Sequence, residues 1–198
     1  MVSAVGYAGF TGSQLLAGGK LASAAFELDL TTAVLSMSVV IVVYTALGGL
    51  QAVVYTDTVQ WGILFTGLIT LALPLGYTAA GGWKGLREAL PPELFSLSNV
   101  TAVQFVTWMV TIVPIWFVAM TMYQRFHASR DVATAQRAWF FAGLLEYPAM
   151  AFIGAILGLF ARVLFPAADP EMGLPLLIRD VLPVGATGLI LAAYFAAI

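Results

Sequence analysis

Long apolar runs alternate with short polar segments along the whole chain. The runs are close to the ~20 residues that a helix needs to cross the hydrocarbon core of a bilayer. The pattern predicts one transmembrane domain with five complete spans and part of a sixth. The expected ranges are 2–26, 30–49, 61–80, 100–123, 138–165 and 183–198. The last range opens at Pro183, a favourable first-turn position, but it is too short to span. We therefore expect a truncated helix and a chain that is a fragment of a longer protein.

Composition leads to the same fold class. Hydrophobic residues make up 61% of the 198 residues and charged residues only 9%, whereas soluble domains carry about 25% charged residues. We therefore expect an all-α integral membrane protein, with the lipid bilayer as its surroundings. The net charge of −2 argues against nucleic-acid binding, which needs a basic surface.

The positions of the charges predict an orientation. The segment Gln124–Arg137 carries three arginines, and the positive-inside rule places such a short basic loop in the cytoplasm. Alternation then puts Leu50–Gln60 in the cytoplasm and the polar segments 81–99 and 166–182 outside. We expect a multi-pass protein of the plasma membrane.

Glu146 breaks the apolar pattern most clearly. It lies within the fifth run, two residues before Pro148. An ionisable group inside the bilayer is costly and often functional, and a proline there frees a backbone carbonyl that can line a cavity. Glu146 is therefore either part of a binding site or a hydrogen-bonded structural residue between helices.

Three further positions have two readings each. Pro114 splits the fourth run, so this helix is either discontinuous around a cavity or simply kinked. Trp116 lies at mid-span and belongs to a packed core or to a gate that faces a cavity. Asp57, with Thr56 and Thr58, fits the N-terminal cap of the third span, although a role on an ion pathway is also open.

Two glycine pairs, Gly18-Gly19 and Gly48-Gly49, lack the sequence context of a phosphate-binding loop. They predict close helix packing or a tight turn. The chain has no cysteine and its single histidine, His127, lies in a loop. We therefore expect neither a thiolate or histidine-rich metal site nor an intramembrane enzyme.

Four segments carry a family resemblance. YTALGGLQAVVYTDTVQ, residues 44–60, closely resembles the signature of the sodium:solute symporter family, which includes sodium/glucose, sodium/iodide and sodium/proline transporters. Three other segments resemble, in order, further parts of that family: GSQLLAGG at 12–19, YQRFHASRDVATAQRA at 123–138, and LPLLIRDVLPVGATGLILAAYFAAI at 174–198.

The resemblance implies a fold of two inverted five-helix repeats. In that scheme the chain holds the last three core helices of the first repeat and the first three of the second. The helix that contains Pro114 resembles the broken first helix of the second repeat. The remaining helices of the same transporter would complete the fold.

The resemblance also implies site residues. For sodium, it implies the backbone carbonyl of Ala197 as a ligand and Asp57 beside the inward sodium route. For the solute, it implies Trp116 beside the substrate, Ile115 at a gate position that is tyrosine in sugar transporters, and Gln14 within the block at 12–19. Glu146 stands where sugar transporters have a lysine that hydrogen-bonds the sugar.

The implied function is sodium-coupled symport of a small organic solute by alternating access. The exchanges at Ile115 and Glu146 point away from a sugar and towards a cationic or hydrogen-bond-donating solute, such as an amine. The alternative is a membrane subunit of a proton-translocating complex with Glu146 as the relay acid. Such relays usually contain several intramembrane ionisable groups, and Glu146 is the one that the pattern places at depth.

Overall fold

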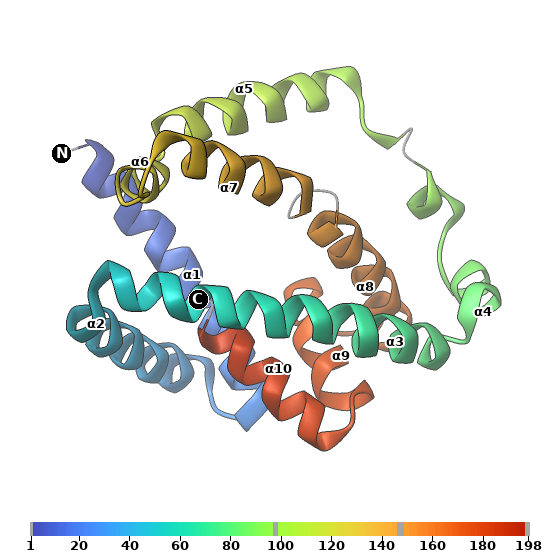
Figure 1. The fold of residues 1–198 in the computed structure, drawn as a ribbon. Helices are drawn as coiled ribbons and strands as arrows, with labels where there is room; N and C mark the ends of the chain where they lie inside the picture. The colour runs from blue at the N-terminus through green and yellow to red at the C-terminus, as the bar shows by residue number, and fades with distance from the viewer. Residues whose placement is uncertain (1, 97–98, 146–148, 197–198) are drawn as a thin grey trace. The chain divides into compact units, whose positions relative to one another are not determined.

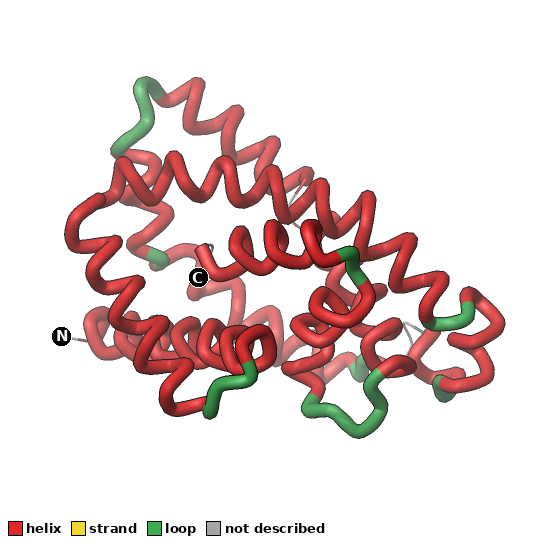
Figure 2. The backbone as a smooth tube through the Cα atoms, turned by 90° about the horizontal axis from the view of Figure 1, so that it is seen from below, coloured by secondary structure: helices red, strands yellow, loops and turns green. Residues whose placement is uncertain are grey.

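The computed structural model describes residues 2–96, 99–145 and 149–196. Within these ranges the regular secondary structure is helical, and no strand occurs (Figure 2). The all-α fold class is therefore confirmed. The chain divides into two compact units, Met1–Leu86 with Ile153–Ile198, and Arg87–Phe152. Each unit is described by itself.

The first unit contains most of the helices and a hydrophobic core. Its elements are α1 (Val2–Phe26), α2 (Leu30–Gly67), the π-helical segment η1 (Leu68–Ala72), α3 (Leu73–Ala79), most of α4 (Gly82–Ala89), most of α8 (Ala151–Leu164), the short 3₁₀ helix η5 (Pro170–Met172), α9 (Gly173–Val181) and α10 (Val184–Ala196). The largest fully buried side chains come from α1, α8, α9 and α10: Leu21, Leu157, Leu177, Ile178 and Ile190.

α2 is two helices joined at a glycine. Gly49 has φ 60° and ψ −169°, while its neighbours are helical, and glycine alone adopts such a backbone without steric cost. The segment Leu50–Gln60, expected as a short connection, is helical as well. The helix therefore resumes directly after Gly49 and not near Trp61, because only one residue departs from helical geometry.

α1 and α10 both pack against α2 (Figure 1). α9, which precedes α10, contacts α3 and η1. α10 therefore follows α9 and lies along α2. Glycines allow these approaches: a Cβ added at Gly67 would lie 2.7 Å from Ile190 Cδ1. A Cβ added at Gly19 would collide with Val34 Cγ2 on α2.

The reading of the two glycine pairs is therefore confirmed, with a different role for each. Gly19 is a site of close helix packing and Gly49 is a tight turn. Gly12, in the same helix as Gly19, has no atom within 4 Å of an added Cβ. Close packing is thus confined to one end of the glycine-rich block at 12–19.

The second unit contains the end of α4, the 3₁₀ helix η2 (Pro92–Phe95), α5 (Ala102–Val118), α6 (Met120–His127) and α7 (Val132–Leu145). The fourth run is broken, but at Ala119 (φ −63°, ψ 106°) and not at Pro114, which lies inside α5. Proline removes one backbone donor, yet its own φ is helical, so the helix continues through it. Tyr123 donates a hydrogen bond to the Phe117 carbonyl at 2.6 Å, beside the break.

Several helices are long and apolar enough to cross a bilayer. Among the described residues these are Leu30–Gly49, Val53–Ala79 and Ala102–His127, with shorter apolar helices at Ala151–Leu164 and Val184–Phe195. Every described side chain of α5 from Ala102 to Phe117 is exposed. A wholly exposed apolar helix needs lipid or further protein around it.

The close approach at Gly19 predicts a site-specific loss of stability. Gly19→Ala is expected to lower the free energy of unfolding by about 1–3 kcal/mol, because the added methyl overpacks the α1–α2 contact. The control Gly12→Ala is expected to raise it by about 0.5–1 kcal/mol through helix propensity. Thermal unfolding of the two purified variants measures both effects, and equal effects at the two positions would contradict this packing.

A second prediction concerns pH and the start of α7. The Thr134 backbone N–H donates to Asp131 Oδ1 at 2.7 Å and its hydroxyl to Oδ2 at 2.9 Å. These bonds hold the pKa of Asp131 below its ordinary value of 3.8. A lowered folded-state pKa contributes stability above the ordinary value, and this contribution is lost as the pH falls below it.

Amide hydrogen exchange at Thr134 is therefore expected to accelerate selectively when the pH falls below about 3.8, relative to other amides of α7. Asp131→Asn keeps a capping side chain but cannot titrate. The selective acceleration should be absent in that variant, and its persistence there would rule out Asp131 as the titrating group.

Candidate functional site

The signature segment at 44–60 folds into a hairpin around Gly49. The Tyr44 and Thr56 hydroxyl oxygens lie 2.5 Å apart across this bend. Thr56 also donates to the Val53 carbonyl at 3.0 Å. Because the threonine hydroxyl has one proton, Tyr44 is the donor to Thr56. The hairpin is thus closed by a side-chain bond beside Asp57.

Asp57 does not cap a helix. It lies inside the helical segment that follows Gly49, and Thr56 and Thr58 donate to the carbonyls of Val53 and Val54 in the preceding turn. The capping interpretation is therefore wrong, since these hydroxyls act as donors inside a helix. Asp57 is half-buried, near the bend end of this helix.

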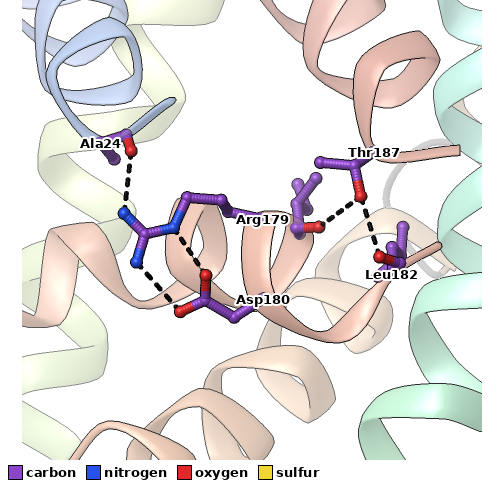
Figure 3. Close-up of polar contacts among 6 residues, drawn as sticks. Ala24, Arg179, Asp180, Leu182 and Thr187 are labelled. Atoms are coloured by element: carbon purple, nitrogen blue, oxygen red, sulfur yellow. Dashed lines mark hydrogen bonds and ion pairs between the residues drawn. The ribbon is translucent and has the colours of Figure 1, made fainter. Parts of the chain in front are cut away.

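The corner between α9 and α10 is held by one hydroxyl. Thr187 Oγ1 lies 3.0 Å from the Leu182 carbonyl oxygen (Figure 3). It lies 3.1 Å from that of Pro183 and 3.2 Å from that of Ile178. The Ile178 and Leu182 carbonyls belong to the end of α9 and the turn after it, where helical partners run out, and the Pro183 carbonyl also accepts the Thr187 backbone N–H. Thr187 therefore fixes the direction in which α10 leaves the corner.

Two basic side chains join α1 to η5 and α9. Lys20 of α1 forms an ion pair with Glu171 and lies 3.7 Å from Asp169 Oδ2. Arg179 of α9 donates to the Ala24 carbonyl of α1 at 3.1 Å (Figure 3). No role was predicted for Lys20 or Arg179. Lys20 is the single basic residue of the first apolar run, which could have drawn attention to it, but its partner Glu171 lies about 150 residues away in the sequence.

Asp180 orients the Arg179 guanidinium. Arg179 Nε donates to Asp180 Oδ1 at 2.6 Å, and Nη2 donates to Oδ2 at 3.0 Å. The bond to Asp180 raises the pKa of Arg179, so the guanidinium stays charged. A two-point contact of this kind fixes the plane of the guanidinium and leaves Nη1 directed at α1.

The end of α1 also touches α10. The rings of Phe26 and Phe195 are stacked, with centroids 5.8 Å apart and an interplanar angle of 16°. Phe195 lies in the last described turns of α10. α10 is therefore fixed near its start by Thr187 and near its end by Phe26.

Gln60 has a buried side-chain amide, and no role was predicted for it either. The side chain is 9% exposed, and within the part of the chain that the structure describes its Oε1 has no hydrogen-bond partner. Gln60 lies about two helical turns before Gly67, so it shares the face of α2 that packs on α10. The feature of the sequence that could have pointed to Gln60 is its position at the end of the signature segment 44–60.

The predicted site residues fall in different parts of the structure. Gln14 is half-buried on α1 in the first unit. Ile115 and Trp116 are adjacent on α5 in the second unit, 56% and 47% exposed. Glu146 and Ala197 lie outside the described residues. Of the predicted solute residues, Gln14 is therefore described in one unit, and Ile115 with Trp116 in the other.

Comparison with known proteins identifies the family. The chain matches the model of the Sodium:solute symporter family over residues 4–198. It is 28% identical to the Sodium/myo-inositol cotransporter 2 of Oryctolagus cuniculus over 226 aligned residues, which cover 93% of this chain and 33% of that protein. It is 27% identical to the Sodium/glucose cotransporter 4 of Homo sapiens, over 87% of this chain and 31% of that protein. No solved structure matches significantly.

The chain belongs to the sodium:solute symporter family. It spans about a third of the length of the curated relatives that it matches. Members of the family are multi-pass membrane transporters and not enzymes. The resemblance seen in the sequence is thus confirmed, as are the integral membrane class and the expectation of a non-enzyme.

The orphan oxygen of Gln60 predicts a stabilising substitution. Gln60→Leu is expected to raise the free energy of unfolding by about 1 kcal/mol, because it removes a buried acceptor that has no partner. Gln136→Leu, at an exposed position on α7, is the control and should give no gain. Thermal unfolding measures both variants. A fall in stability for Gln60→Leu would mean that the oxygen is bonded in the complete protein.

Proposed function

We propose that the chain is a segment of a transporter that couples uptake of a small organic solute to the sodium gradient. The match to the sodium:solute symporter family over residues 4–198 carries this proposal. Relatives named as sodium cotransporters support it. The mechanism is alternating access, in which sodium stabilises one of two conformations and the solute binds to that conformation.

Sodium is the transported coupling ion, and hard cations of this kind prefer oxygen ligands. The proposed ligand in this chain is the Ala197 carbonyl, with Asp57 on the route to the cytoplasm. Two observations support a defined position for α10: its close approach to Gly67 and the Phe26–Phe195 stack. The half-buried carboxylate of Asp57 near a helix bend fits an entry or exit point for a cation.

The proposed solute site combines Gln14, Ile115, Trp116 and Glu146 in an inverted-repeat fold that the rest of the transporter completes. The relatives are named for myo-inositol and glucose. In this chain we propose a non-sugar solute that bears an amine, because a carboxylate at Glu146 in a dry site favours a cation or a hydrogen-bond donor. The proposed location is the plasma membrane.

A proton relay through Glu146 is the competing function. Within the described residues, Lys20 lies in an apolar helix, but it is paired with Glu171 and so is not a free relay group. The family match favours sodium over protons as the coupling ion.

Uptake by the full transporter in cells that lack related activity tests the proposal. Uptake of radiolabelled ethanolamine, L-proline, choline, D-glucose and myo-inositol is compared in sodium and in potassium medium. We expect sodium-dependent accumulation of at least one amine. Glu146→Gln should reduce the ratio of maximal uptake rate to KM for that amine at least about tenfold, the effect of losing roughly 1.4 kcal/mol of binding. Glu93→Gln, a substitution in the exposed η2 segment, should change little.

Sodium-dependent uptake of D-glucose or myo-inositol alone would refute the solute proposal and leave sodium coupling intact. Uptake that is unchanged in potassium medium would refute sodium coupling. Unchanged amine uptake in Glu146→Gln would remove Glu146 from the site.

A further inference from the structure

Arg179 and Lys20 are the charged side chains through which α9 and η5 hold α1. Arg179 spans two elements that are 155 positions apart in sequence, from its own position on α9 to the Ala24 carbonyl. Lys20 spans 151 positions to Glu171. Lys20 and Ala24 lie one helical turn apart, so both contacts hold the same face of α1.

Arg179 contacts the C-terminal end of α1. The last carbonyls of a helix have no partners within it and carry partial negative charge. A guanidinium bound there satisfies one carbonyl and complements the helix dipole. Asp180 keeps the guanidinium in this orientation through two hydrogen bonds. The contact is therefore specific in geometry as well as in charge.

The same end of α1 reaches α10. Phe26, two residues after Ala24, stacks on Phe195, and Phe195 lies two residues before Ala197. At the other end of α10, Thr187 holds the corner with α9, the helix that carries Arg179. These contacts form a closed loop from α9 to α1, from α1 to α10, and from α10 back to α9 (Figure 3 shows the first and the last).

We propose that Arg179, with Lys20 as a second tie, is a positioning residue for the coupling ion. By fixing the last turn of α1, it sets the position of Phe26 and hence of the end of α10. This inference rests on the proposed sodium-coupled function. It adds a residue that contacts neither ion nor solute but determines the affinity for sodium.

The test measures binding of radioactive sodium to the purified full transporter, with no solute present. Arg179→Gln removes the charge and the contact with α1. The dissociation constant for sodium is expected to rise about two- to thirtyfold, the range found for substitutions that act through packed networks. Arg179→Lys keeps the charge without the planar fork and should give a smaller rise.

The matched control is Arg162→Gln. Arg162 is an exposed arginine in the last turn of α8, and its replacement should leave the dissociation constant unchanged. Asp180→Asn is a milder variant that removes the orienting charge and keeps Arg179. It is expected to raise the constant in the same direction, and it serves if Arg179→Gln does not fold.

Two further variants separate positioning from general stability. Phe26→Ala removes the contact with α10 but leaves both ties, and it should also weaken sodium binding. Lys20→Glu should weaken it, and the reversed pair Lys20→Glu with Glu171→Lys should restore it. A purely structural role would lower the yield and the unfolding temperature of these proteins without changing the sodium constant.

The outcomes distinguish the inference from the function beneath it. Wild-type protein that binds no sodium would refute the proposed function itself. Wild-type protein that binds sodium, with unchanged constants in Arg179→Gln and Asp180→Asn, would refute the positioning role. An equal rise in Arg162→Gln would also refute it, since the effect would then be general to arginine loss.

Discussion

A polypeptide in a bilayer must satisfy its own backbone, because lipid offers no hydrogen-bond partner. Hydroxyl side chains lie at three interruptions of the helices, and at two of them they donate to backbone carbonyls. Tyr44 bonds to Thr56 across the bend at Gly49. Tyr123 donates to the Phe117 carbonyl beside the break at Ala119. Thr187 donates a hydrogen bond to the Leu182 carbonyl just after α9 ends. The bend at Gly49 and the corner after α9 lie in segments that carry the family resemblance.

Close packing around α2 is the second organising feature. In lipid, helices associate through small residues that let backbones approach. Gly19 does this against the part of α2 before Gly49, and Gly67 does it in the part after. α1 is thereby held to the first helix of the α2 hairpin and α10 to the second. Two charged side chains add directional contacts to this packing: Lys20 links α1 to η5, and Arg179 links α9 to α1. Packing thus sets the proximity of α1 and α10, and directional polar bonds set their orientation.

Much of this could be predicted from the sequence, and the limits have physical causes. Apolar runs near bilayer length predicted helices, because length and hydropathy are local properties. The glycine pairs predicted close packing and a turn, which Gly19 and Gly49 provide. The break in the fourth run was predicted at Pro114 and occurs at Ala119, since a proline is compatible with helical φ. The ties of Lys20 and Arg179 were missed because they join residues that only the fold brings together. The same is true of the burial of Gln60.

The proposed function requires that movement of sodium and movement of a solute are obligatorily linked in the full transporter. Thermodynamic linkage then requires that each gradient can drive the other. The most direct measurement is radioactive sodium entry into proteoliposomes that contain the full transporter, driven by an inward gradient of the amine that it accumulates. Coupled symport predicts sodium accumulation above equilibrium that ends when the amine gradient is removed. Amine entry without sodium movement, or with proton movement in its place, would contradict the account.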